Sequence, residues 1–405
     1  MKYVFKTNIN KNEYDAFIKS NSCVSFMQEY GWAKVKKDWQ HLHCALYEND
    51  TIVAACLVMI RSLPLGFKIF YVPKGYVVDF ENAEIVSTFT KEIVKEAKKR
   101  KGYVLKIDPN FCIKETSIQE ILDKQEMEYP TFTCSNYEIK HQNLMNAGFA
   151  LQKRELDLDS TTQPRFNMTI PLVDSTYKQL DALQLKNNFR KKIRRYFGNF
   201  HKERGVYYEH TKDITKIDEF IEMINKTEER QHIVLRNKEY FENIMRNNNA
   251  YLFFGKLDLK TYENFLSTKG KVEELESIHT LLKQGKDNIT ISSSLVIIPK
   301  NENGIRTSEY LYTGNDLTFS KLYASYGLVY NICQFSIEQN CHFLNLGGVD
   351  GTLEDHLSMF KARFNPIVWE FSGEYDYILS PLYYPIEKFL PIVKRYYRKL
   401  KHIKQ

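Results

Sequence analysis

The part of the chain best arranged for chemistry is a short strand that runs into two glycines and is followed by a lysine. Apolar residues alternate over 343–346, as expected of a buried strand, and Gly347 and Gly348 end the run. A glycine pair permits a left-handed backbone and leaves N–H groups facing a ligand. Lys361 follows after a short helical segment, with Phe360 beside it. This order predicts one cation aimed at the strand end, the alternative being a solvated helix end.

A second strand end carries a carboxyl group. The run from Tyr103 to Pro109 is typical of a strand, and Asp108 closes it directly before the proline. An acid there can take a proton from an attacking amine or orient a substrate, and it suits an ordinary turn equally well. Tyr103 is a candidate substrate contact, with a packed strand aromatic as the alternative.

Length and composition narrow the class of protein. The 405 residues exceed one ordinary core, so two domains are expected, and the net charge of +7 suits an anionic partner without identifying one. Seven cysteines without a CxxC pair indicate free thiols in a reducing compartment, and no metal site is expected. No signal peptide is apparent and the longest apolar run, 52–60, is too short to span a bilayer. We expect a cytoplasmic protein, with peripheral membrane contact left open.

The expected elements repeat once along the chain. In each half, three strands precede one helix and a further strand: 43–47, 52–60, 67–72, 82–99 and 103–109, then 251–255, 289–298, 309–313, 318–339 and 341–346. Helices over 175–197, 213–229 and 237–247 precede the second set, and the charged residues 258–286 interrupt it as a helical hairpin. Asp108 and the glycine pair then occupy equivalent strand ends, beside a cleft between the halves.

This order of elements resembles the GNAT acyltransferase fold, so we expect an α/β (α+β) protein with two GNAT-like domains in tandem. GNAT proteins bind acyl-CoA through a glycine-rich loop before the central helix. The corresponding segments here, 73–79 and 314–318, do not match that loop. An acyl-CoA donor is therefore disfavoured, and no cofactor is expected.

Short motifs in nearly all parts of the chain carry a closer resemblance. They include Gln28-Glu-Tyr-Gly-Trp32, Lys106-Ile-Asp-Pro109, Gln163-Pro-Arg165, Leu235-Arg-Asn-Lys-Glu-Tyr240, Leu344-Asn-Leu-Gly-Gly-Val349 and Phe360-Lys-Ala-Arg-Phe-Asn-Pro366. In this order they resemble the Fem-type (FemABX) aminoacyltransferases of peptidoglycan bridge synthesis, most of all the MurM/MurN type of lipid II aminoacyl ligase. The resemblance implies a first domain of residues 1–152 completed by 373–405, a second of 153–372, and an inserted hairpin at 258–286.

The resemblance implies transfer of Ser, Ala or Gly from aminoacyl-tRNA to the side-chain amine of the stem peptide on a peptidoglycan precursor, lipid II or UDP-MurNAc-pentapeptide. An aminoacyl ester is already activated, so the reaction needs a neutral amine, a positioned carbonyl and a stabilised oxyanion. Lys361 matches the family's catalytic lysine, proposed to stabilise the tetrahedral intermediate, and Phe360 would position it. Asp108 is the candidate proton acceptor.

The resemblance also implies substrate-binding residues. Lys36 and Arg236 match contacts to the diphosphate of the acceptor, a task that suits cations. Tyr240 and Tyr312 match substrate positions, with core packing as the alternative for both. The chain departs from the family at Lys74, where an arginine is common, and in a hairpin that looks short.

Two basic stretches rich in aromatic residues, 186–195 and 394–401, suit RNA phosphates or anionic lipid headgroups, and equally a solvated helix face. Three alternatives to a bridge-forming ligase stay open. They are an immunity factor of the same family that alters cross-bridges against a lytic bacteriocin, an acyl-CoA-dependent N-acyltransferase, and a non-catalytic module that binds tRNA or envelope components.

Overall fold

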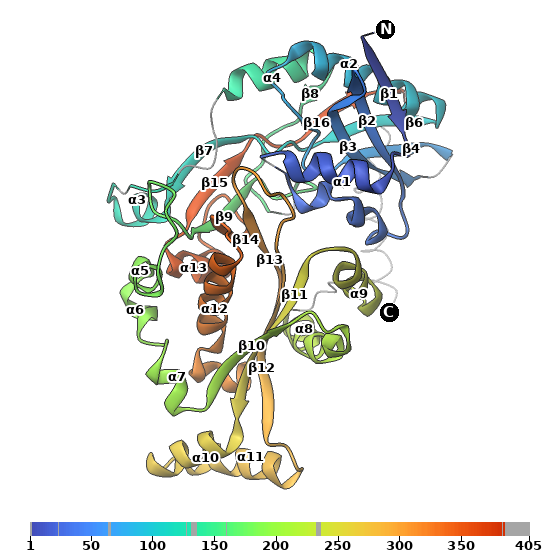
Figure 1. The fold of residues 1–405 in the computed structure, drawn as a ribbon. Helices are drawn as coiled ribbons and strands as arrows, with labels where there is room; N and C mark the ends of the chain where they lie inside the picture. Colours follow the sequence, from blue (N-terminus) through green and yellow to red (C-terminus); the bar gives the residue numbers. More distant parts are fainter. Residues whose placement is uncertain are drawn as a thin grey trace, which may run out of the picture.

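The computed structural model of the chain describes residues 2–22, 24–63, 66–126, 128–130, 136–158, 160–231, 236–382 and 384. These residues form two mixed sheets of eight strands each, with helices packed on their faces (Figure 1). Each sheet is built mainly from one half of the chain. The expected α/β fold with two GNAT-like units in tandem is confirmed.

The first sheet has the strand order β1-β2-β3-β4-β6-β16-β8, with β5 paired to β3. Among its described strands only β4 and β6 run parallel, and helix α2 (Ala83–Lys99) connects them. Asn82 caps α2 by accepting a hydrogen bond from the Ile85 N–H, and the apolar side chains of the helix join the core of this sheet. The strands are β1 (Tyr3–Thr7), β2 (Gln40–Glu48), β3 (Thr51–Ser62), β4 (Lys68–Val72), β5 (Val77–Val78), β6 (Gly102–Ile107), β8 (Ala150–Leu151) and β16 (Tyr375–Ile378).

The second sheet, in the order β10-β11-β12-β13-β14-β9-β15-β7, repeats this plan. Its described strands pair antiparallel except β13 and β14, which run parallel and are joined through α12 (Ala324–Glu338). Antiparallel strands, a crossover helix and a parallel strand thus follow one another in both halves. The strands are β7 (Cys112–Ser117), β9 (Phe166–Pro171), β10 (Val206–Thr211), β11 (Ala250–Asp258), β12 (Asn288–Ile297), β13 (Thr307–Asn315), β14 (Phe343–Val349) and β15 (Ile367–Phe371).

The single helix predicted over 175–197 is wrong. That segment contains two short helices, because Phe189 takes an extended backbone between them (φ −78°, ψ 158°) and is fully buried in the core of the second sheet. None of the described helices combines the length and apolar character needed to cross a bilayer. The helices besides α2 and α12 are α1 (Lys11–Ser20), α3 (Ile118–Asp123), α4 (Tyr137–Asn146), α5 (Ala182–Asn188), α6 (Lys191–Arg194), α7 (Asn199–Glu203), α8 (Ile217–Gln231), α9 (Lys238–Asn247), α10 (Leu259–Thr268), α11 (Val272–Lys283) and α13 (His356–Lys361).

The two halves exchange strands. Strand β7 leaves the first half to pair with β15 in the second sheet, and β16 returns late in the chain to pair with β6 and β8 in the first. Lys106 on β6 holds the returning chain through Glu374 at 2.9 Å and Asp376 at 2.8 Å. The domain limits of 152 and 372 stay a proposal, since β7 lies before the first limit and pairs beyond it.

A shared core joins the halves. Phe26, Trp32 and Met59 from the first half pack in one cluster with Phe220 and Phe241 from the second, among other residues. Beside it the Glu29 carboxylate, almost fully buried, accepts a hydrogen bond from the Lys300 backbone N–H and lies 3.4 Å from its ammonium group. The halves therefore pack tightly, and a site at their seam has walls from both.

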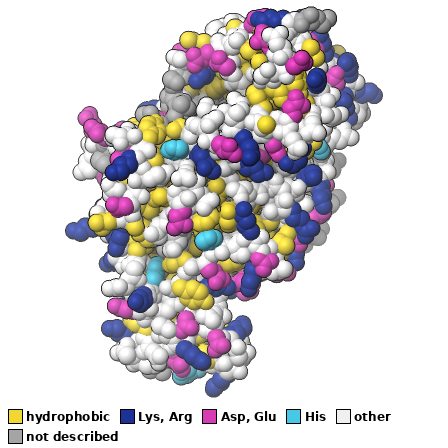
Figure 2. Space-filling model, in the orientation of Figure 1, with side chains coloured by type: hydrophobic (Ala, Val, Ile, Leu, Met, Phe, Trp, Pro, Cys, Tyr) yellow, Lys and Arg dark blue, Asp and Glu magenta, His cyan; other side chains and the backbone are white. Residues whose placement is uncertain are grey.

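The inserted hairpin consists of α10 and α11, between β11 and β12. It lies at the far end of the second sheet, where it forms a narrow extension whose surface mixes acidic and basic side chains (Figures 1 and 2). Its apolar side chains, including Leu259, Tyr262 and Ile278, share a core with Val206 and Leu322 of the body. The hairpin is therefore anchored at its base.

Candidate active site

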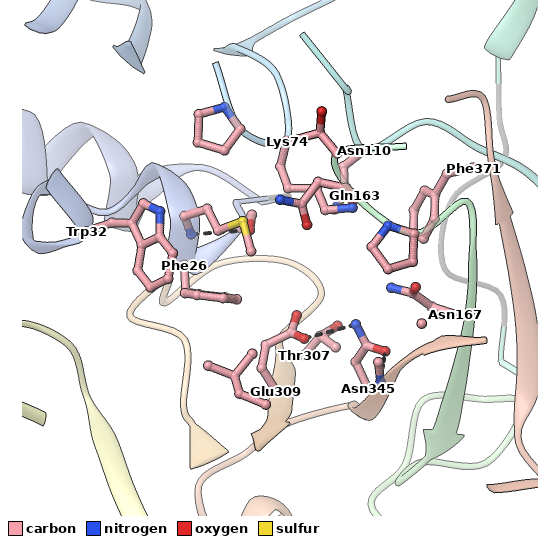
Figure 3. Close-up of a pocket in the computed structure, with 18 of the residues that line it drawn as sticks. Phe26, Trp32, Lys74, Asn110, Gln163, Asn167, Thr307, Glu309, Asn345 and Phe371 are labelled. Atoms are coloured by element: carbon pink, nitrogen blue, oxygen red, sulfur yellow. Dashed lines mark hydrogen bonds between the residues drawn. The ribbon is translucent and has the colours of Figure 1, made fainter. Parts of the chain in front are cut away.

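A cavity of about 420 Å³ lies between the two sheets, and residues of both halves line it. Lys36, Arg236, Tyr240 and Tyr312, predicted as substrate-binding residues, line it together. Figure 3 shows residues of the first half, such as Trp32 and Lys74, facing residues of β13, β14 and β15 across the space. Further lining residues are Phe26, Tyr71, Gln163, Asn167, Thr307, Glu309, Asn345, Gly347, Gly348, Trp369 and Phe371.

The end of β14 forms part of the cavity wall through its glycine pair. Gly347 has a φ of +82°, in the left-handed region that glycine tolerates. The Lys361 Nζ donates a hydrogen bond of 2.8 Å to the Gly348 carbonyl and lies 3.8 Å from where a Cβ on residue 347 would stand. The lysine ammonium group thus lies directly behind the glycines, as the sequence predicts.

Helix α13 holds this lysine in place. Asp355 caps the helix by accepting hydrogen bonds from the N–H groups of Leu357 and Ser358. Lys361 is only 5% exposed, and burial lowers its pKa to about 7, an effect that the charge of Asp355 partly opposes. Among the described residues no carboxylate contacts this ammonium group, and such a buried cation gains most when a negative charge develops beside it.

Phe360 does not line the cavity. Its ring packs 5.2 Å from the ring of Tyr326 and 5.5 Å from that of Phe364, measured between centroids. Consecutive residues of a helix project about 100° apart, so Phe360 faces the core while Lys361 faces the glycine pair. Phe360 is placed to anchor the helix that carries the lysine.

Lys36 and Arg236 give the cavity a cationic region, to which Arg61 adds. Burial lowers the pKa of Lys36, and the positive charges of Arg236 and Arg61 lower it further. No ion pair with a carboxylate is found for these three side chains in the described part of the chain. The Arg236 guanidinium lies 5.3 Å from the ring of Tyr240, whose hydroxyl accepts a 3.2 Å hydrogen bond from Tyr312. Clustered cations without acids form a favourable place for an anion.

Asp108 lies behind the cavity wall. It is 5% exposed, and its two oxygens accept hydrogen bonds from the Lys74 backbone N–H at 2.8 Å and the Tyr71 hydroxyl at 3.1 Å. Burial raises its pKa to about 7, against the lowering effect of the Lys74 charge. Asp108 therefore holds two residues that do line the cavity, and its role as a proton acceptor stays a prediction.

Sequence analysis missed a carboxyl that does line the cavity, Glu309 on β13. Its Oε2 accepts a 2.9 Å hydrogen bond from the Asn345 amide, whose oxygen accepts one of 2.8 Å from the Gly347 N–H (Figure 3). Burial raises the pKa of Glu309 to about 8, and the charge of Lys74 opposes the shift. The available signal was a single acid in a strand otherwise made of Ser, Thr, Tyr and Leu before the glycine at 314.

Tyr103 lies away from the cavity. It is fully buried and packs in a small cluster with Val104 and the half-buried Phe67 and Ile69. The position is that of a packed strand aromatic, the alternative that the sequence left open. A substrate contact for Tyr103 has no support in this placement.

One basic stretch, 394–401, lies outside the described residues. In the other, 186–195, Phe189 and Ile193 are buried while three cations are exposed: Lys191, Lys192 and Arg195. The Arg195 guanidinium lies 4.9 Å from the ring of Tyr196, which stacks on Tyr323 with 3.8 Å between centroids. The stretch thus combines surface charge with stacked aromatic rings.

Comparison with known proteins agrees with this fold. The sequence model of the FemAB family matches residues 9–277 and 267–391. Lipid II:glycine glycyltransferases of Staphylococcus aureus strains MRSA252 and N315 are each 26% identical to the chain, over 95% of its length and 96% of theirs.

Two solved structures share the fold. The crystal structure of FemX superimposes with a TM-score of 0.74 at 24% identity, covering 96% of this chain and all of that one. A conserved protein of unknown function from Bacteroides thetaiotaomicron VPI-5482 has a TM-score of 0.51 at 11% identity, over 92% of this chain and 98% of that one. The family match spans nearly the whole chain, and the protein therefore belongs to the FemAB family.

Proposed function

We propose that this enzyme is an aminoacyltransferase that moves Ser, Ala or Gly from aminoacyl-tRNA to the side-chain amine of a peptidoglycan stem peptide, as a step in cross-bridge formation. The observation that carries the proposal is one cavity that holds both Lys36 and Arg236, which have no carboxylate partner among the described residues, and the glycine strand end backed by Lys361. The relatives' name, lipid II:glycine glycyltransferase, supports the same class of reaction and acceptor.

The cationic region suits the acceptor. A peptidoglycan precursor joins its sugar to a lipid or a nucleotide through a diphosphate, which is dense in charge. Arg236 offers forked hydrogen bonds and Lys36 a compact charge, and neither has to leave an acidic partner to bind it. A lipid-linked acceptor would bring the enzyme to the cytoplasmic surface of the membrane, while a soluble one would not.

The strand end suits the acyl transfer. The acceptor amine attacks the ester carbonyl, a C–N bond forms, and the C–O bond to the tRNA ribose breaks. One proton leaves the amine and one is gained by the ribose oxygen. The carbonyl oxygen becomes an oxyanion in between, and Lys361 behind Gly347 is the cation available to stabilise it. No covalent enzyme intermediate is needed.

The surface around residues 186–195 supports an RNA donor. The stacked pair Tyr196 and Tyr323 continues to Tyr326, whose ring packs on Phe360, the residue beside Lys361. Stacked aromatics with nearby exposed cations suit the single-stranded end of an RNA. These rings reach helix α13, which carries Lys361, so the RNA end of the donor would bind beside this helix.

The test is direct. The protein is incubated with precursor and tRNA charged with Ser, Ala or Gly, and the product is weighed by mass spectrometry. We expect a mass gain of one or more of these residues on the stem peptide, and none from acetyl-CoA. Acetylated product, or no product with any charged tRNA, would contradict the proposal.

A further inference from the structure

Among the described residues that line the cavity, Glu309 is the one acid. Glu309 is half-buried, and the surface that it retains belongs to the cavity lining. Its carboxyl group is directed into the cavity in Figure 3, beside Thr307 and Asn345. The other charged residues that line this space are all cations: Lys36, Lys74 and Arg236.

The fold makes little use of the charge on Glu309. One carboxyl oxygen accepts the 2.9 Å hydrogen bond from Asn345, a contact that a neutral glutamine would make equally well. The carboxyl has no ion pair within 4 Å among the described residues, and Lys74 acts on it only as a nearby charge. Placing an acid in this wall costs solvation free energy, which a bound cation would recover.

Asp108 offers a contrast, because its oxygens are already engaged. The Lys74 N–H and the Tyr71 hydroxyl occupy them, and the side chain is absent from the cavity lining. Of the two acids on which the Lys74 charge acts, Asp108 and Glu309, only Glu309 lines the cavity.

We propose that Glu309 binds the ammonium group of the acceptor's side chain and so selects stem peptides that carry an amine. This role rests on the proposed function. The acceptor is the substrate that bears both a diphosphate and a distant ammonium group, and the cavity offers both complements, Lys36 with Arg236 for the one and Glu309 for the other. The hydrogen bonds from Glu309 through Asn345 to Gly347 connect the ammonium site with the strand end where the carbonyl reacts.

The test compares two soluble precursors in a calorimetric titration, a UDP-linked pentapeptide with lysine at the acceptor position and the same compound with norleucine there. We expect the parent protein to bind the lysine form about 10-fold to 100-fold more tightly, the range of a charge-assisted hydrogen bond. Glu309→Gln should bring this ratio close to one while leaving affinity for the norleucine form unchanged, which also shows that the variant is folded.

Two further variants sharpen the test. Glu309→Asp keeps a charge in the wall and should keep part of the discrimination. Glu302→Gln removes an exposed acid on the preceding turn, paired with Lys19 at 3.1 Å, and should leave the ratio as in the parent.

Three results would overturn the role of Glu309 alone. They are undiminished discrimination in Glu309→Gln, a parent that binds both precursors equally, and loss of discrimination in Asp108→Asn but not in Glu309→Gln. A parent that binds neither precursor and transfers no amino acid would instead remove the proposed function, and this role with it.

Discussion

The ends of strands β6 and β14 occupy equivalent places in two similar sheets, yet Asp108 at the first is absent from the cavity lining, whereas Gly347 and Gly348 at the second belong to it. At the end of β6, Pro109 contacts Gly75 of the loop that follows β4, so closely that a Cβ on Gly75 would lie 2.8 Å from the Pro109 Cα. The oxygens of Asp108 there accept hydrogen bonds from the Tyr71 hydroxyl and the Lys74 N–H. At β14, a Cβ on Gly347 would meet the Lys361 Nζ at 3.8 Å and a backbone oxygen at 3.9 Å. At the first strand end the carboxyl group is engaged by its neighbours, whereas at the second Gly347 keeps room beside the cavity while Gly348 packs against Pro164.

A repeated fold thus provides two equivalent strand ends, and the contacts of the neighbouring residues set what each end presents to the cavity. The first half supplies Lys36, Lys74 and Asn110 to the cavity, while the oxygens of its Asp108 are engaged by neighbours. The second half supplies Gly347, Glu309 and the buried Lys361. Variants on the two sides should therefore affect different steps.

The largest effect is expected at Lys361. Lys361→Met keeps the apolar stem and removes the charge, so we expect both substrates to bind nearly normally and turnover to fall about 10²-fold to 10³-fold, as when one oxyanion donor is lost. Lys361→Arg should also be slow, because a wide guanidinium misplaces the donor. Single-turnover rates at saturating substrate measure this. Unimpaired chemistry in the Met variant would remove Lys361 from the reaction.

A smaller effect is expected at the cationic region. Lys36→Ala and Arg236→Ala should each weaken acceptor binding by about 1.5–3 kcal/mol, the value of a hydrogen bond to a charged group. Titration with the soluble precursor gives the affinities, and the exposed Lys34 provides a control whose Ala variant should bind like the parent. If the Lys36 and Lys34 variants behave alike, the diphosphate does not bind here.

Alanine substitutions at Gly347 and Gly75 test how closely each strand end is packed. Gly347→Ala should lower the free energy of unfolding by about 1–2 kcal/mol, the cost of a left-handed backbone, because its methyl group has room. Gly75→Ala carries the same strain at φ +77° and also collides with Pro109, so it should lose more. Urea unfolding of both variants measures the difference. Equal losses would show that the first strand end is not tightly filled.

The smallest effect is a pH dependence. Lys361 has a pKa of about 7, so its charged fraction falls as the pH rises through that value, whereas an arginine stays charged. The ratio of the parent's single-turnover rate to that of Lys361→Arg should fall about fivefold between pH 7 and pH 8. Titration of Asp108, Glu309 and the acceptor amine affects both proteins and cancels in the ratio. A ratio independent of pH would mean that Lys361 does not titrate in this range.

The strands and helices of the repeated core could be predicted because the spacing of apolar residues along each one is visible in a short stretch of sequence. A continuous run of apolar residues marks β3, and the spacing of buried residues along α2 marks an amphipathic helix. Strand β7 was not predicted, because Lys114 and Glu115 break its apolar pattern and its partner β15 lies far along the chain. Pairing between such distant segments is decided by tertiary packing, which short patterns do not contain.

The site was predicted in part for the same reason. The strand, glycine pair and lysine are close in sequence, so their order alone predicts that they meet. The nearness of Lys36 to Arg236 rested on resemblance to a family. The exclusion of Phe360 and Tyr103 from the cavity, and the inclusion of Glu309, depend on which way side chains turn after packing. The lone acid in its strand and the helical spacing of Phe360 and Lys361 are only weak signals of that.

The strand exchange also has a consequence for biosynthesis. Strand β6 ends at Ile107, but its partner β16 begins only at Tyr375, so the first sheet stays incomplete on the ribosome until nearly the whole chain has emerged. Multidomain chains usually fold their amino-terminal unit first. We expect that this protein cannot, because its first sheet lacks β16 until late in synthesis. A nascent chain that stops near residue 152 would carry an unpaired strand edge, the kind of surface on which chains aggregate.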